Sequence, residues 1–206
     1  MAKQKWVIYL ITWWSGYFVM ALELLGGRTL APFFGTGIYV WGAIITLFML
    51  SLSLGYLLGG HFSARQPTLR KLSILLLAAT LAATPCASWA TPILERVFDT
   101  LPDPRYGALA SSLVLFFLPI TISGAISPYA IRLLVDGQGT SGQVAGMVFF
   151  ISTFGSTAGT LLTSFYLVLI FELDQLFYGM MVISILVTLT ALLIGSVSRA
   201  AAPHAA

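Results

Sequence analysis

The stretch Glu23–Trp41, ELLGGRTLAPFFGTGIYVW, decides how the chain is read. An acid, Glu23, lies inside an apolar segment, and a base, Arg28, follows five residues later. A turn rich in glycine and proline comes next, and Trp41 opens a second apolar segment. A carboxylate is costly inside hydrocarbon, so such a group is expected to have a partner or a task.

Composition places the whole chain in the membrane. It is 58 % hydrophobic and only 8 % charged, whereas a soluble domain carries about 25 % charged residues. Its apolar runs approach or exceed the roughly 20 residues that cross a bilayer. The net charge of +3 is spread singly over segment ends, which suits membrane topology and argues against nucleic-acid binding.

The sequence predicts an all-α, six-helix integral membrane bundle, because helices satisfy their backbone groups within lipid. The expected spans are 6–25, 38–58, 72–93, 108–135, 144–171 and 175–197. Residues 1–198 then form one transmembrane domain, and 199–206 form a flexible tail. The connection LERVFDTLPDPRYG is expected to hold a short interfacial helix followed by a turn.

The basic residues predict the orientation. Seven of them fall on the side of the two termini: Lys3, Lys5, Arg65, Arg70, Lys71, Arg132 and Arg199. Three fall on the other side: Arg28, Arg96 and Arg105. Cytoplasmic loops carry the excess of Lys and Arg, so both termini are expected in the cytoplasm, most naturally across a bacterial inner membrane.

A shift of 104 positions indicates an internal repeat. It places Arg28 on Arg132, Gly55 on Gly159 and Leu58 on Leu162 without a gap. Spans one and two map onto spans four and five, so the copies cross the membrane in opposite directions. Such an inverted three-plus-three repeat is typical of transporter folds and resembles half of a major-facilitator transporter. Chance matching of apolar sequence is the alternative.

Small residues mark expected helix contacts. Gly55 and Gly59, Gly142 and Gly146, and Gly155 and Gly159 each lie four residues apart on one helix face. Small residues let helix backbones approach closely within lipid. We expect these motifs to pack inside the monomer rather than to dimerise it.

The candidate site residues are few. Glu23 and Arg28 form either a structural ion pair or a site for a cationic group or a proton. Tyr17 is placed on a face similar to that of Glu23, where aromatic rings beside a carboxylate suit an ammonium ligand. Arg132 either snorkels to the headgroups or anchors an anion. The chain offers no catalytic constellation, no metal site and no cofactor motif.

Three ordered segments resemble one family. ALELLGGRTLAPFFGTGIYVWGAIITLFMLSLSLGYLLGG, with its E, R-x-L-x-P and tryptophan, is similar to the membrane domain of fused, transporter-like spermidine synthase homologues. ISPYAIRLL and STFGSTAGTLLTSFYLV are similar to later parts of that domain. In that family a cytoplasmic aminopropyltransferase-like domain commonly follows. This chain reaches Ala206 before one, so the resemblance carries over the membrane module alone.

Three functions follow as expectations. The first is a non-catalytic membrane subunit that anchors or regulates a synthase-like partner and binds a polyamine-like or amphipathic cation near Glu23. The second is an accessory subunit of a larger, energy-transducing membrane complex. The third is a small polyamine or solute transporter.

Overall fold

The computed structural model describes residues 2–64, 66–135, 137 and 140–200, and the side chains of 3–64, 66–135, 137 and 140–195. The described residues form helices joined by short turns, with no strand among them. Their order is α1 (Ala2–Phe34), α2 (Ile38–Ser63), α3 (Leu69–Ala82), α4 (Thr84–Ser88), α5 (Ala90–Thr100), α6 (Pro104–Gly124), α7 (Ile126–Leu134), α8 (Ser141–Leu162), the π-helical turn η2 (Thr163–Leu167), α9 (Val168–Ile170) and α10 (Leu173–Ala200).

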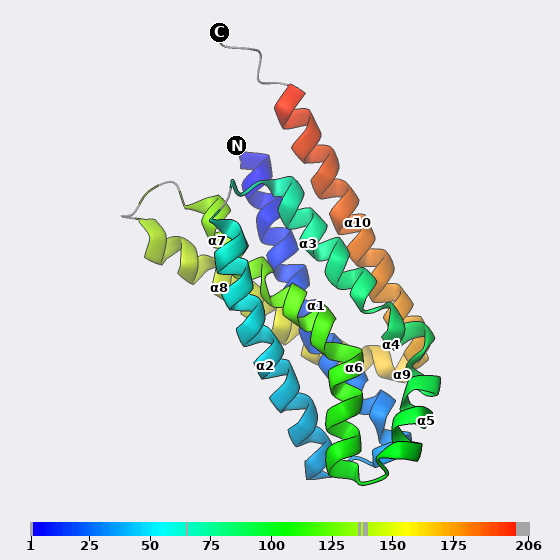
Figure 1. Ribbon diagram of the computed structural model, residues 1–206. Helices are drawn as coiled ribbons and strands as arrows, with labels where there is room; N and C mark the ends of the chain where they lie inside the picture. The colour runs from blue at the N-terminus through cyan, green and yellow to red at the C-terminus, as the bar shows by residue number, and fades with distance from the viewer. Residues whose placement is uncertain (1, 65, 136, 138–139, 201–206) are drawn as a thin grey trace.

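Six helical spans in this part of the chain are long and apolar enough to cross a membrane. They are Lys3–Phe34, Ile38–Ser63, Leu69–Ser88, Pro104–Leu134, Ser141–Ile170 and Leu173–Gly195. The predicted six-helix, all-α membrane bundle is therefore confirmed. The start of α1 and the end of α10 lie at the same end of the bundle (Figure 1). Residues 201–206, most of the expected tail, lie outside the described residues, while α10 continues to Ala200.

The first helix is longer than predicted. The glycines and the proline after Glu23 suggested that it ends near Leu25, but α1 continues to Phe34. Gly26 and Gly27 leave room for the rings of Phe116 and Trp41, because a Cβ at either glycine would lie 2.8 Å from a ring carbon. The real turn comes at Gly35, whose φ of +80° favours glycine. The Gly-Gly pair is thus a packing feature within a helix.

The fourth span is divided into two helices near Pro128. Helix α6 ends at Gly124 and α7 begins at Ile126, with Pro128 in the first turn of α7. Proline has no backbone N–H, so the helical hydrogen bond that residue 128 would make is missing. The third span is also interrupted, at Ala83. The helix predicted in the connection LERVFDTLPDPRYG is α5, and its expected position at the membrane interface stays a prediction.

The packing of the spans has the symmetry that the repeat predicts. Helix α1 packs most extensively on α8, and α2 packs comparably on α6. Helix α3 packs on α10, while α6 contacts α3 much as α1 contacts α10. Exchanging the first three spans for the last three leaves this pattern unchanged.

Backbone contacts at glycines follow the same 104-residue register. A Cβ at Gly55 would collide with the carbonyl oxygen of Thr121, and one at Gly159 would collide with that of Tyr17. Gly55 maps onto Gly159 and Tyr17 maps onto Thr121, so the two contacts are repeat mates.

Gly59 and Gly155 make similar close approaches, to Ala125 and Trp13. Gly142 and Gly146 differ from the expectation, because no atom beyond their own helix lies within 4 Å of a Cβ built on either. They face open space at the start of α8, so that motif does not pack inside the monomer.

Candidate functional site

Glu23 lies deeper in its helix than the sequence suggested. The middle of α1 is Phe18, so Glu23 lies about 7.5 Å along the axis from that point. The half-thickness of bilayer hydrocarbon is about 15 Å. With α1 centred in a bilayer, the carboxylate therefore lies within the hydrocarbon region, half-buried against other helices.

Glu23 and Arg28 do not form an ion pair. Arg28 is exposed, and its Nη1 instead donates to the backbone carbonyl of Val168 at 3.3 Å. Val168 opens the short helix that ends the fifth span, where a cation complements the unpaired carbonyls of the helix end. Within the described part of the chain, Glu23 has no hydrogen bond and no ion pair.

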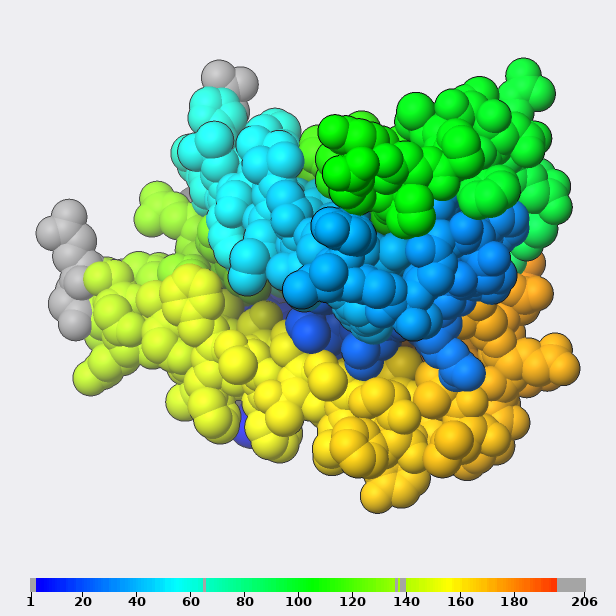
Figure 2. All heavy atoms as spheres, turned by 90° about the horizontal axis from the view of Figure 1, so that it is seen from below, coloured from blue at the N-terminus to red at the C-terminus, as the bar shows by residue number. Residues whose placement is uncertain are grey.

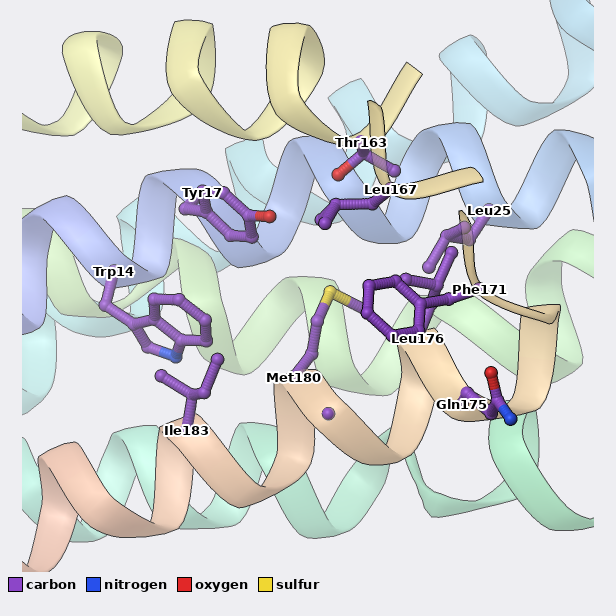
Figure 3. Close-up of a pocket in the computed structure, with 11 residues that line it drawn as sticks. Trp14, Tyr17, Leu25, Thr163, Leu167, Phe171, Gln175, Leu176, Met180 and Ile183 are labelled. Carbon is purple, nitrogen blue, oxygen red and sulfur yellow. The ribbon is translucent and has the colours of Figure 1, made fainter. Parts of the chain in front are cut away.

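Tyr17 and Glu23 do not share a face. Six residues on an α-helix turn about 600°, which leaves the two side chains about 120° apart. Tyr17 lines a cavity of about 210 Å³ between α1, η2 and α10, and Glu23 does not (Figure 3). The predicted placement of Tyr17 beside the Glu23 carboxylate is therefore wrong.

The cavity in Figure 3 is almost entirely apolar. Its wall on α1 is the stacked pair Trp14 and Tyr17, with ring centroids 4.9 Å apart. Trp14 Nε1 donates to Ser184 Oγ at 2.7 Å, which ties α1 to α10. The Thr163 hydroxyl, in the π-helical turn, is buried without a partner among the described residues. Such a cavity suits lipid-like groups better than a charged amine.

A second, smaller cavity of about 80 Å³ lies between α1, α2, α6, α7 and α8. Six of its eleven lining residues carry a hydroxyl group, and the lining comprises Ser15, Gly16, Val19, Met20, Leu52, Tyr56, Ser123, Gly124, Ser127, Ser152 and Ser156. Its volume is enough for several water molecules, or for one ammonium group with part of its chain. We call it the hydroxyl cavity.

The polar groups of the hydroxyl cavity are only partly satisfied. Ser15 Oγ donates to the Ser123 carbonyl at 3.4 Å, and Ser156 Oγ donates to the Gly16 carbonyl at 3.2 Å. The Ser123 hydroxyl is 3 % exposed and has no partner among the described residues. An unpaired buried hydroxyl costs free energy that a bound hydrogen-bonding ligand recovers.

The hydroxyl cavity lies where the two repeats meet. Val19 and Ser123, Met20 and Gly124, and Leu52 and Ser156 are each 104 positions apart, and all six line it. Ser127, another lining residue, is the repeat mate of Glu23. Glu23 is not a lining residue, but it lies one turn beyond Val19 and Met20 on α1, so helical spacing puts it on the face of α1 that the cavity touches.

The region around the hydroxyl cavity is open on one side. Seen from the end opposite the termini, α1 is visible at the bottom of a groove between α2 and α8 (Figure 2). Met20 and Glu23 are half-buried and Tyr56 is 47 % exposed, in keeping with an open cavity.

The remaining predicted residues lie elsewhere. The ring of Trp41 packs on Gly27, which fixes the start of α2 against α1. Arg132 is exposed in the last turn of α7 and makes no hydrogen bond or ion pair within the described residues, as expected for a side chain that reaches the headgroups. None of the predicted site residues lines the hydroxyl cavity; Glu23 lies one helical turn beyond its lining residues Val19 and Met20.

Comparison of the chain with protein-family models, with curated proteins and with solved structures finds no match.

Proposed function

We propose that this protein is an integral membrane module that binds an amine-bearing cation, of the polyamine or amphipathic kind, at the hydroxyl cavity. The observation that carries the proposal is Glu23, an acid at membrane depth with no partner in the described chain. Intramembrane carboxylates mark ion or substrate sites. The neighbouring serine hydroxyls supply acceptors for the N–H groups of an ammonium ion.

Binding of spermidine to the purified protein in lipid nanodiscs tests this proposal. We expect Glu23→Gln, which keeps the shape and removes the charge, to weaken binding about tenfold or more, equivalent to about 1.4 kcal/mol. Ser123→Ala should weaken it by a smaller factor. Glu172→Gln, an exposed acid outside the cavity, is the matched control and should bind as the parent does. Equal affinity of the parent and Glu23→Gln would refute the proposal.

The resemblance to the spermidine synthase-like family suggests a role for the whole module. In this proposal the module anchors or regulates a synthase-like partner at the face that holds both termini. The excess of basic residues on that face supports its placement in the cytoplasm. Isolation from native membranes in mild detergent should recover such a partner, and recovery of the chain alone would remove this part of the proposal.

A transport role is the second candidate. The symmetric packing of the spans and the position of the cavity between the repeats both favour it, because transporters bind substrate at the interface of inverted repeats. Uptake of labelled spermidine by proteoliposomes, compared with Glu23→Gln and with protein-free vesicles, separates the two roles. Uptake equal to that of empty vesicles, together with intact binding, would assign the site to sensing or anchoring.

A further inference from the structure

A different cavity lies at the end of the bundle that holds the termini. It has a volume of about 380 Å³ and lies between the last turn of α2, the start of α3 and α7. Its lining divides into a polar group, His61, Lys71 and Tyr129, and an apolar group, Phe62, Ile74 and Leu75. A mostly apolar cavity at a helix end, with a few polar groups in its lining, matches the boundary between headgroups and acyl chains.

Two of the polar lining residues, Lys71 and Tyr129, can donate to hydrogen-bond acceptors in the cavity. Lys71 Nζ donates to the Gln66 carbonyl at 3.0 Å, which holds the ammonium group near the start of α3. Tyr129 is only 2 % exposed, and its hydroxyl oxygen accepts from the Thr68 N–H at 3.2 Å. A phenol can donate as well as accept. The Tyr129 O–H proton has no acceptor among the described residues, so a ligand in the cavity is its natural partner.

The charged side chains near this cavity favour an anionic ligand. Apart from Glu23 within α1, the described acids lie in α5, at the start of α6 or near the start of α10, at the opposite end of the bundle. Lys71 and the neighbouring Arg70 are both exposed near the cavity. Basic pockets between transmembrane helices recognise acidic lipid headgroups.

We propose that this cavity binds an anionic glycerophospholipid. Lys71 and His61 receive the phosphate, Tyr129 donates its hydroxyl proton to a phosphate oxygen, and Phe62, Ile74 and Leu75 contact the upper part of an acyl chain. The apolar wall is what distinguishes a lipid from a free phosphate ion. The site shares no lining residue with the hydroxyl cavity, so either can fail without the other.

Native mass spectrometry of the detergent-purified protein, titrated with phosphatidylglycerol or phosphatidylcholine, tests the proposal. We expect phosphatidylglycerol to bind at least tenfold more tightly. Lys71→Gln should weaken it about fivefold, since one basic residue near the membrane surface contributes about 1 kcal/mol. Tyr129→Phe should weaken it by a few-fold, whereas Lys71→Arg, which keeps the charge, should keep the parent affinity. Thermal unfolding of each variant checks that it folds.

Arg70→Gln is the matched control, because Arg70 precedes Lys71 in the chain but does not line the cavity. It should keep the parent affinity. An equal loss in Arg70→Gln and Lys71→Gln would overturn the proposal in favour of a diffuse basic surface. Equal binding of the two lipids would overturn it too. Displacement of phosphatidylglycerol by millimolar inorganic phosphate alone would assign the cavity to a free anion.

Discussion

The two glycine crossings, α2 over α6 and α8 over α1, use the same backbone contact in different surroundings. Gly55 meets the Thr121 carbonyl, and its mate Gly159 meets the Tyr17 carbonyl. Yet nine of the 26 residues of α2 are buried in the monomer, against three of the 22 residues of α8. A narrow stripe of small residues therefore suffices to attach a helix whose remaining surface faces lipid or another protein. The fifth span depends on that stripe more heavily than the second.

The largest effect should come from adding one methyl group at each crossing. Gly159→Ala and Gly55→Ala each drive a Cβ into a backbone carbonyl, which should lower the free energy of unfolding by about 1–3 kcal/mol. Gly159→Ala should lie at the upper end, because α8 has fewer other contacts. Thermal unfolding in detergent measures both. Gly42→Ala and Gly146→Ala, also repeat mates but with open space around them, are the controls. If the two crossing variants lose no more unfolding free energy than these controls, the close packing is disproved.

The two halves also differ in charge at mated positions, Glu23 in one and Ser127 in the other. Glu23→Gln should raise the free energy of unfolding by about 1 kcal/mol or more, because it removes a charge from membrane depth. The same variant should lose cation binding, so stability and binding should move in opposite directions. A fall in melting temperature would instead reveal a structural partner for the carboxylate.

A hydrogen bond distinguishes the α1–α10 contact from its mate, α6–α3. Trp14 donates to Ser184 in the first, whereas the mated positions are Leu118 and Thr80, and Thr80 bonds within its own helix. Trp14→Phe should cost about 0.5–1.5 kcal/mol of unfolding free energy, the usual net contribution of such a bond. Trp13→Phe is the control. A double-mutant cycle with Ser184→Ala isolates the pairwise contribution, and a coupling of zero would disprove it.

The smallest effect concerns the turn before α6, which has no charged counterpart in the first half. The Arg105 guanidinium and backbone N–H, which bond the Asp103 carboxylate, hold the pKa of that carboxyl below its usual value. A lowered pKa contributes stability above the unfolded-state value, about 3.9, and this is lost as pH falls through the folded-state value. Both side chains are exposed, so the effect should be small: Asp103→Asn should slightly reduce the fall in melting temperature between pH 5 and pH 3. An unchanged dependence of melting temperature on pH would show that the Asp103–Arg105 contact does not contribute to stability.

The sequence predicts the six spans well because their length and apolar character are properties of local composition. It places the end of α1 wrongly because Gly26, Gly27 and Pro32 look like a turn when the rings that fill the space beside the glycines are unknown. It also places Tyr17 with Glu23, although six residues turn a helix side chain away. Local spacing alone does not decide which neighbour a face will meet.

The hydroxyl cavity is missed for a related reason. Ser15, Ser123, Ser127, Ser152 and Ser156 are scattered over four helices and look like ordinary small residues along the chain. The repeat register holds the signal, since it maps Glu23 onto Ser127 and Leu52 onto Ser156. Comparing mated positions for polar side chains would have indicated the region, although not its volume.

The carbonyl-to-glycine contacts also decide which bodies can move. They join α1 to α8 and α6 to α2, the first helix of each half to the middle helix of the other. At these contacts backbone lies directly on backbone, without side chains between the helices that could rearrange. We therefore expect a large motion to move α1 with α8, and α2 with α6, as two rigid pairs that rotate relative to each other. The carboxylate of Glu23 would travel with one pair and the tyrosine hydroxyl of Tyr56 with the other, so a pivot opens or closes the groove between them.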